Sequence, residues 1–236
     1  MNMDRKIIGV MSVPRYGPLM TAGCIMSTFN AHGILVRMHT GAFWEQQIQN
    51  VLEDVIEEGY TDAIIMDYDS AFSQEQFNYM LSRWIHNHWI DSLSCIQPRR
   101  GDGAAMLSID SEESGKIELK STAKPSFKCK TAPFGLTFIR LDKLKAMALP
   151  WFHSNPSESG SWRNDSGKVD ADIYFWRKWE ASGNNLYVLP EINLGHFEEL
   201  VAQHNPKTGK VMHRYAQDFS NDPFGKEVVE VIPKGE

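Results

Sequence analysis

The sequence predicts an α/β protein built on a mostly parallel sheet with helices on both faces. Short apolar segments alternate with segments of helical periodicity: residues 6–13, 34–38, 63–66 and 93–96 for strands, and 17–32, 44–58 and 73–88 for helices. Gly33 and Gly59 follow two of these helices, where a glycine commonly ends a helix, and Ser73 with Gln76 forms a capping box before the third. This alternation is typical of parallel sheets. The third helix is expected to bury Phe77, Met80, Leu81, Trp84, Ile85 and His88.

The second half of the chain predicts an antiparallel extension of this sheet. Its expected elements are a hairpin of residues 104–109 and 116–120, a strand 134–140, a short helix 142–148, a helix 170–182 and a strand 186–189 that Pro190 ends. Residues 154–168 are rich in Ser, Asn and Gly, which predicts a mobile loop. We expect a single domain over 1–236, with a nucleotide-binding half 1–100, an acceptor half 101–205 and a C-terminal extension 206–236.

Composition narrows the class of protein. The 236 residues are 42% hydrophobic and carry a net charge of −6, which argues against a broad nucleic-acid or anionic-membrane surface. The three cysteines show no C-x-x-C spacing, so we expect reduced thiols in the cytoplasm. The sequence contains no run of roughly eighteen apolar residues, so it predicts no transmembrane segment. The sequence does not indicate an oligomeric state.

Two carboxylates follow the third predicted strand. Asp67 and Asp69 are separated by one residue after the apolar run of 63–66. Side chains alternate along a strand, so both are expected to point the same way at its carboxyl end, where ligands of parallel sheets bind. Like charges repel unless a cation joins them, and Mg²⁺ is often shared between carboxylates and substrate phosphates. The pair predicts a divalent-metal site; a simple Asx turn is the alternative.

Several features in order give the sequence a family resemblance. They are Pro14 after the first strand, Gln49-Asn50, Asp67-x-Asp69, Ala132-Pro133-Phe134-Gly135, Pro150-Trp151-Phe152, Asp172-Ile173-Tyr174-Phe175, Gly183, Tyr187-Val188-Leu189-Pro190 and Leu194-Gly195-His196. Over roughly residues 6–200 the chain resembles the GT-A glycosyltransferases, which are nucleotide-diphospho-sugar transferases. The resemblance implies a GT-A-like fold and transfer of a sugar from a nucleoside diphosphate, with UDP favoured, to a hydroxyl acceptor with Mn²⁺ or Mg²⁺.

The resemblance also implies roles for individual residues. Asp69 matches the metal ligand, Asp67 lies toward the ribose or the metal, and His196 matches a further metal ligand. Pro14 and Arg15 match the nucleotide-binding end of the first strand, and Asn50 belongs to the same donor-binding set. The matching carboxylate for the general base is Asp172, which implies inversion at the anomeric carbon.

The sequence departs from the family at two of these places. Gln49 stands where the family usually has an arginine, and Asp170-Ala171-Asp172 replaces two adjacent acids. The shift leaves open whether Asp170 or Asp172 faces the acceptor, and Asp172 could instead cap its helix. Without a partner, His196 would be an ordinary surface histidine.

The chemistry of sugar transfer is consistent with these assignments. A metal would offset the charge that develops on a diphosphate leaving group, and an acceptor hydroxyl needs a base within hydrogen-bond reach. The helix start would keep Asp172 ionised. Trp162 is a lone aromatic residue in a polar loop and is a candidate for stacking on the acceptor sugar, whereas Trp176 and Trp179 are expected in the core.

Two other functions remain open. A nucleotidyltransferase would need a glycine-rich loop after the first strand, and residues 12–17 contain one glycine. A non-catalytic protein that binds nucleotide sugars or acts as a scaffold would keep the fold without the chemistry, as Gln49 and the altered acid pair allow. The sequence does not indicate which sugar or which acceptor is used.

Overall fold

The computed structural model describes residues 5–14, 19–100, 105–108, 126–163, 167–204, 208 and 210–215. The chain divides into two compact units. The first comprises Met1–Arg99 with Ala104–His196, and the second comprises Arg100–Gly103 with Phe197–Glu236. No helix within the described residues is both long and apolar enough to span a membrane.

The first unit contains a seven-stranded sheet in the order β2-β1-β3-β7-β5-β8-β6. Its strands are β1 (Ile7–Val13), β2 (Val36–Thr40), β3 (Asp62–Asp67), β5 (Ser92–Ile96), β6 (Phe127–Lys128), β7 (Thr137–Arg140) and β8 (Leu186–Asn193). β1 pairs in parallel with β2 and β3, and β5 pairs in parallel with β8. β7 lies antiparallel between β3 and β5, and β6 is antiparallel to β8. The predicted fold class, with a largely parallel sheet and an antiparallel element from the second half, is confirmed.

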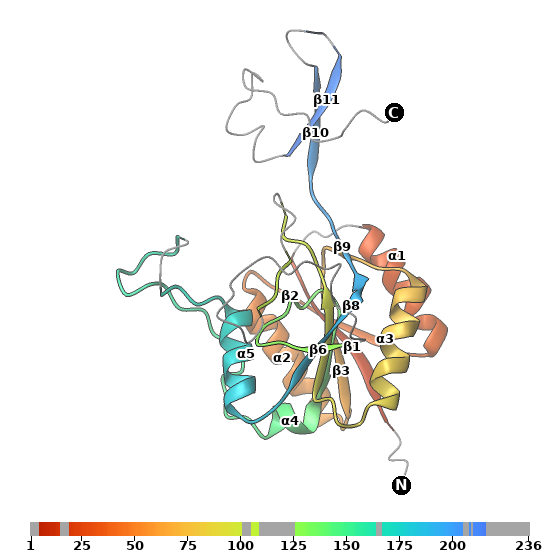
Figure 1. Cartoon of the computed structure of the whole chain (residues 1–236), viewed down its shortest axis with the longest axis vertical. Helices are drawn as coiled ribbons and strands as arrows, with labels where there is room; N and C mark the ends of the chain where they lie inside the picture. The colour runs from red at the N-terminus through yellow and green to blue at the C-terminus, as the bar shows by residue number, and fades with distance from the viewer. Residues whose placement is uncertain are drawn as a thin grey trace. The chain divides into compact units, whose positions relative to one another are not determined.

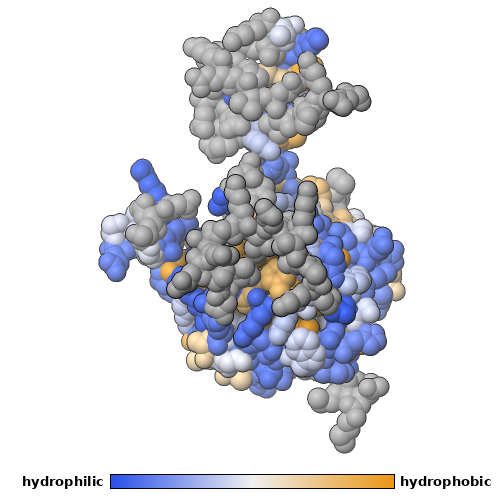
Figure 2. All heavy atoms as spheres, in the orientation of Figure 1, coloured by the Kyte–Doolittle hydropathy of each residue, from blue (hydrophilic) through white to orange (hydrophobic). Residues whose placement is uncertain are grey.

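Helices cover both faces of the sheet (Figure 1). They are α1 (Leu19–Thr28), α2 (Trp44–Glu57), α3 (Gln74–His86), α4 (Leu141–Lys145), α5 (Ala171–Ala181) and the short 3-10 helix η1 (Asn30–His32). Alternate residues of β3 supply the two cores, as the period of a strand requires. Ala63 and Ile65 pack with α2, α4 and α5 on one face, whereas Ile64 and Met66 pack with α1 and α3 on the other. On the face shown in Figure 2, hydrophilic side chains predominate over the outer surface of this unit.

The helix signals in the sequence locate α2, α3 and α5 to within one or two residues. Ser73 and Gln76 form the predicted capping box, and Gly33 and Gly59 have positive φ angles of 63° and 77°. The N-terminal helix is shorter than expected, because α1 ends at Thr28 and η1 follows. The side chains of Trp176 and Trp179 are fully buried in the core, as expected.

The buried face predicted for α3 is only partly correct. Phe77, Met80, Leu81 and Trp84 are buried. Ile85 is 40% exposed and His88 is also exposed, so these two predictions are wrong. The helix ends at His86, so the helical period does not extend to residue 88.

The prediction that Pro190 ends a strand is wrong, because β8 continues to Asn193. Cys95 of β5 lies opposite Leu189, whereas the next residue, Ile96, lies opposite Asn193. Pro190 therefore falls in an irregular stretch of the ladder where the sheet does not require its missing N–H. β8 thereby reaches the segment that carries His196.

At the amino end of β3, a buried ion pair joins two strands. Asp62 is 1% exposed; Arg140 of β7 donates to its carboxylate, and the Trp84 indole N–H donates to Asp62 Oδ1 at 3.0 Å. The Arg140 guanidinium also lies 3.9 Å from the centre of a Trp84 ring. This network is structural, because it lies at the start of the strand whose other end carries Asp67.

In the second unit, β10 (Leu200–His204) and β11 (Val211–Tyr215) form an antiparallel hairpin that the sequence patterns did not predict. Met212 and Arg214 are buried on one face of this hairpin. The hairpin predicted at 104–120 lies largely outside the described residues, as does most of the extension 206–236. All three cysteines are free.

Candidate active site

A short antiparallel pair brings two distant segments together at the carboxyl edge of the sheet. The chain leaves β3 at Asp67, turns through Tyr68 and Asp69, and forms β4 (Ser70–Ala71). β4 pairs with β9 (Gly195–His196), and Ser70 lies opposite His196. The segments that carry Asp69 and His196 therefore meet.

Asp69 and His196 form a direct contact in this pair. Asp69 Oδ2 lies 3.2 Å from His196 Nε2, and the two side chains are 9% and 11% exposed. The other ring nitrogen, Nδ1, lies 3.0 Å from the carbonyl oxygen of Pro98. A carbonyl oxygen only accepts hydrogen bonds, so the nitrogen that faces it must be the donor. The ring proton of His196 is therefore assigned to Nδ1. In a neutral imidazole, Nε2 then directs a lone pair at the carboxylate, and a proton or a metal ion is needed to make this contact favourable.

Residues that follow β5 support the contact between Asp69 and His196. Gln97 is fully buried, and its Nε2 donates to Ser70 Oγ at 3.0 Å. The next residue, Pro98, provides the carbonyl that fixes His196. Gly135 lies against the Gln97 amide, in a space where a Cβ atom at position 135 would collide with that side chain. Gln97 thus connects β5 to the short strand that follows Asp69.

Asp67 is half-buried beside this pair and is held by an indole. The Trp44 side chain, at the start of α2, donates a hydrogen bond to the Asp67 carboxylate. The Trp44 ring packs against Phe134 and Phe152, with ring centres 5.6 Å and 5.3 Å away. Burial, followed by the charges of Asp69 and Asp172, raises the pKa of Asp67 to about 7, while His196 and the Trp44 hydrogen bond act in the opposite direction.

Asp172 belongs to the same electrostatic centre, since its charge acts on Asp67. It lies in the first turn of α5, and its Oδ1 accepts a hydrogen bond from the backbone N–H of Ile173 at 2.8 Å. Burial raises the pKa of Asp172 above its usual range. Asp170 is at the N-cap position of α5, makes no side-chain capping hydrogen bond, and forms an ion pair of 2.9 Å with Lys168. The two candidate bases therefore differ in their surroundings.

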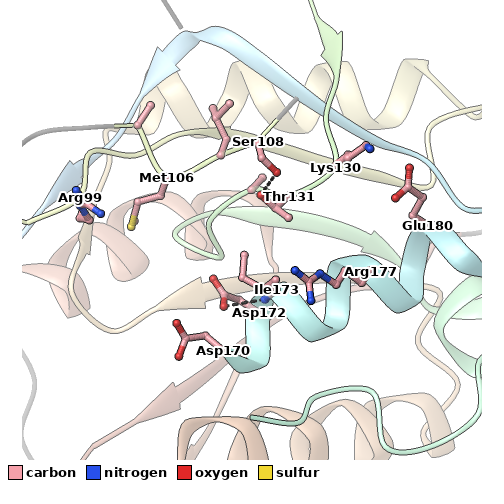
Figure 3. Close-up of a pocket in the computed structure, with 13 residues that line it drawn as sticks. Arg99, Met106, Ser108, Lys130, Thr131, Asp170, Asp172, Ile173, Arg177 and Glu180 are labelled. Carbon is pink, nitrogen blue, oxygen red and sulfur yellow. Dashed lines mark hydrogen bonds between the residues drawn. The ribbon is translucent and has the colours of Figure 1, made fainter. Parts of the chain in front are cut away.

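A pocket of about 600 Å³ opens beside Asp172 (Figure 3). Its wall comes from three parts of the chain. They are Arg99 with residues 105–108, residues 130–132, and Asp170 with the α5 side chains of Asp172, Ile173, Arg177 and Glu180. Ser108 Oγ and Thr131 Oγ1 lie 2.7 Å apart on this wall. The pocket thus combines hydroxyl groups, charges of both signs and apolar surface.

The other predicted site residues lie in several places. Pro14 is half-buried directly after β1, whose Ser12 lies opposite Asp67, and Arg15 lies outside the described residues. Asn50 is exposed on α2. The amide of its neighbour Gln49 instead accepts a hydrogen bond from the Trp151 backbone N–H at 3.1 Å. Trp162 is 58% exposed and does not line the pocket.

Several residues of this centre were not predicted from the sequence. Trp44 fitted the apolar stripe of a helix, and nothing in the pattern showed that its N–H faces Asp67. Gln97, a polar residue directly after the buried segment 92–96, was a signal that could have been used. The cationic side chains that line the pocket come from separate segments and share no sequence motif.

A metal ion fits this centre only if a bound substrate completes its coordination shell. Within the described residues, no three His, Cys, Asp or Glu side chains form a group that could hold a metal. Asp69 and His196 provide one carboxylate oxygen and one imidazole nitrogen facing each other. Mg²⁺ commonly takes one or two protein ligands and completes its shell with substrate phosphates and water. The donor set therefore fits an ion that arrives with a diphosphate.

Solved structures resemble this chain at low sequence identity. A197 from STIV aligns with a TM-score of 0.56 and 14% identity, covering 86% of this chain and 92% of that chain. At this identity the likeness concerns the fold alone. GalNAc-T7 with UDP, GalNAc and Mn²⁺ aligns at 0.49 and 10% identity, over 83% of this chain and 44% of that chain. The mannosyltransferase PcManGT from Pyrobaculum calidifontis with GDP-Man and Mn²⁺ aligns at 0.46 and 10% identity, over 82% and 57%.

The scores of these two glycosyltransferases are too low to carry an argument about this chain. No protein family and no curated protein matches the sequence.

Proposed function

We propose that this protein is a metal-dependent glycosyltransferase of the GT-A type, which transfers a hexosyl or pentosyl group from a nucleoside diphosphate to a hydroxyl acceptor. One observation carries the proposal. Asp67, Asp69, His196 and Asp172 come from three distant segments and gather at the carboxyl edge of a parallel sheet, where ligands of such sheets bind.

Asp69 and His196 are the proposed ligands of Mn²⁺ or Mg²⁺, and Asp67 is the proposed contact to the ribose or to the same ion. When bound, the ion would offset the charge that develops on the diphosphate leaving group. Trp44 supports this role for Asp67, because its hydrogen bond orients the carboxylate.

Asp172 is the proposed general base, and Asp170 is not. Asp172 lines the pocket and has a raised pKa, and proton transfer is most efficient when the pKa of a base lies near the working pH. Asp170 also lines the pocket, but its carboxylate is exposed and engaged with Lys168. A base placed across from the leaving group implies inversion at the anomeric carbon.

The remaining assignments follow the same scheme. We assign donor binding to residues 1–100, with Pro14, Arg15 and Asn50 near the nucleotide. We propose that this nucleotide is UDP. We assign acceptor binding to residues 101–205, where Trp162 contributes a stacking surface. We also propose that the protein is cytoplasmic.

Nucleotide binding tests the metal site. Thermal unfolding of the wild type with UDP or GDP is measured in Mn²⁺ and in EDTA. A nucleotide at about 100 times its dissociation constant adds about 2.7 kcal/mol to the free energy of unfolding. We expect this gain in Mn²⁺ only, and we expect Asp69→Asn to lose it while Asp142→Asn, an exposed acid on α4, keeps it. The metal assignment would be refuted if the nucleotide stabilised the wild type equally in EDTA and in Mn²⁺, or if it stabilised Asp69→Asn as much as the wild type.

Donor hydrolysis or transfer tests the base. We expect Asp172→Asn to lower kcat by about 10²–10⁴-fold, the range typical of a lost general base, and to leave nucleotide binding intact. Asp170→Asn is the matched control and is expected to retain activity. Nucleotide binding without turnover across a wide acceptor panel would favour the non-catalytic alternative. Equal losses in both variants would contradict the choice of Asp172.

A further inference from the structure

The amide of Gln97 is fully buried although only one of its two polar ends is paired. Its Nε2 donates to Ser70 Oγ at 3.0 Å. Its Oε1 is also buried, and within the described residues no group donates a hydrogen bond to it. A buried amide oxygen without a donor costs free energy, which an apolar side chain of similar length would not. The stability of the fold therefore gives no reason for a glutamine at this position.

The partner of this amide lies directly beside the Asp69–His196 contact. Ser70 follows Asp69 in the chain, is fully buried, and lies opposite His196 in the pairing of β4 with β9. From the other side, Thr21 Oγ1 of α1 donates to the Ser70 carbonyl oxygen at 3.2 Å. Among the described residues, Thr21 and β9 thus hold Ser70 through its backbone, and Gln97 holds its side chain.

The residues on either side of Gln97 hold the opposite strand. The Ile96 carbonyl oxygen accepts from the Leu194 backbone N–H at 2.8 Å, directly before β9. The Pro98 carbonyl oxygen lies 3.0 Å from His196 Nδ1. Residues 96–98 therefore reach both sides of the contact, because the Gln97 side chain holds β4 and the two flanking carbonyl groups hold the segment that carries His196.

The separation that this segment maintains suits a shared ion. Two ligand atoms at right angles around a divalent ion, each at about 2.1 Å from it, lie about 3 Å apart. Asp69 Oδ2 and His196 Nε2 are 3.2 Å apart. Outer partners that orient metal ligands typically change metal affinity by about 10–100-fold when they are removed. The hydrogen bond from Gln97 to Ser70 is such an outer partner.

We propose that Gln97 is a positioning residue of the metal site, which acts through Ser70 to keep Asp69 at the separation from His196 that a shared divalent ion requires. The role of the ion rests on the proposed function. The positioning of the two side chains rests on the hydrogen bonds alone, so it can be tested in the protein without metal.

Gln97→Met removes the amide and retains a side chain of similar length. In calorimetric titrations with UDP in Mn²⁺, we expect it to bind about 10–100-fold more weakly than the wild type. In EDTA its Tm should be equal to that of the wild type or higher, because the unpaired oxygen is lost together with the hydrogen bond. A role confined to stability would instead lower Tm.

Ser92→Ala is the matched control on the same strand. Ser92 is also fully buried, and its Oγ donates to the Asn185 carbonyl oxygen at 2.7 Å, at the end of β5 away from the site. We expect this variant to lower Tm, because a buried carbonyl oxygen loses its donor, and to bind UDP as the wild type does. The two variants should therefore separate affinity from stability.

A double-mutant cycle tests whether Gln97 acts through Ser70. Ser70→Ala removes the acceptor of the hydrogen bond and should weaken Mn²⁺-dependent UDP binding to a similar extent. The double variant, Gln97→Met with Ser70→Ala, should lose no more than either single variant, because both remove one interaction. Losses that add would show that the two side chains act independently and would overturn the proposal.

Nitrogen-15 NMR of the His196 ring provides a readout without metal or nucleotide. With the ring signals assigned by comparison with His196→Asn, we expect Gln97→Met and Ser70→Ala to shift them in EDTA and Ser92→Ala to leave them unchanged. Unshifted signals in Gln97→Met, UDP affinity equal to that of the wild type, or an equal loss of affinity in Ser92→Ala would overturn the proposal. If the wild type binds no UDP in Mn²⁺, the proposed function fails, and the ring signals still decide whether Gln97 positions this contact.

Discussion

Replacing Asp67 by Asn should stabilise the metal-free protein at neutral and alkaline pH. The fold holds the Asp67 carboxylate beside Asp69 and Asp172, and burial with these charges raises its pKa from 3.8 to about 7. Each pKa unit corresponds to about 1.36 kcal/mol, so the full shift amounts to about 4 kcal/mol. Asn keeps an oxygen that accepts the Trp44 N–H and removes the charge. We expect a gain of about 2–4 kcal/mol, because water and side chains relax part of the penalty.

The sign of this effect depends on pH. Well below pH 3.8, Asp67 is protonated in both the folded and the unfolded chain and contributes no penalty. As the pH rises from about 4 to about 7, the unfolded chain releases this proton while the folded chain keeps it, so stability falls. Above pH 7 both states are ionised and the penalty is constant. The advantage of Asp67→Asn should therefore grow between pH 4 and pH 7 and then level off.

Thermal unfolding in EDTA from pH 4 to pH 8 measures this difference. For a chain of this size, a gain of about 2–4 kcal/mol raises Tm by about 4–16 °C. Glu57→Gln, which removes an exposed carboxylate on α2, is the control and should follow the wild type. If Asp67→Asn and the wild type were equally stable at pH 8, or if their difference were the same at pH 5 and pH 8, then burial and the neighbouring carboxylates would not raise the pKa of Asp67 as described.

Three further predictions concern the structure around the site. Arg140→Ala should lower the free energy of unfolding by about 3–5 kcal/mol in denaturant titrations, because it leaves the buried Asp62 carboxylate without its cation. Gly135→Ala should displace Gln97 and weaken Mn²⁺-dependent nucleotide binding by about tenfold in calorimetric titrations, at a cost of about 1–3 kcal/mol in stability. In the native protein only Cys24 should react with a thiol reagent, since burial raises the pKa of the other two thiols.

The sequence predicted those parts of the fold that local patterns determine. The limits of α2 and α3 follow from apolar periodicity, a capping box and a terminal glycine, all of which act within a few residues. β7 was placed approximately along the chain, but its antiparallel position between β3 and β5 depends on contacts distant in sequence. The same limit applies to Pro190, whose place in β8 is set by the register against β5.

The candidate site was predictable to the extent that strand ends attract ligands. Asp67 and Asp69 were found because carboxylates follow an apolar strand. The approach of Asp69 to His196, 127 positions away, was expected only from the order of family motifs, and the structure places these two side chains in contact. The role of Trp44 was not predicted, because the helical period indicates which face of a helix is apolar and not where an indole N–H points.

The charge arrangement also bears on why the chain retains this cluster. Where the sheet ends, burial and then the charges of Asp69 and Asp172 raise the pKa of Asp67, and burial also raises the pKa of Asp172. Nothing in the packing of the fold requires acids at these positions, since Trp44 could be satisfied by an amide. Sequences commonly give up stability of this kind where a ligand restores it. A cation between Asp69 and His196 would reduce the repulsion on Asp67 as well, so metal binding and the stability of this edge are coupled, and Mn²⁺ should stabilise the wild type more than Asp67→Asn.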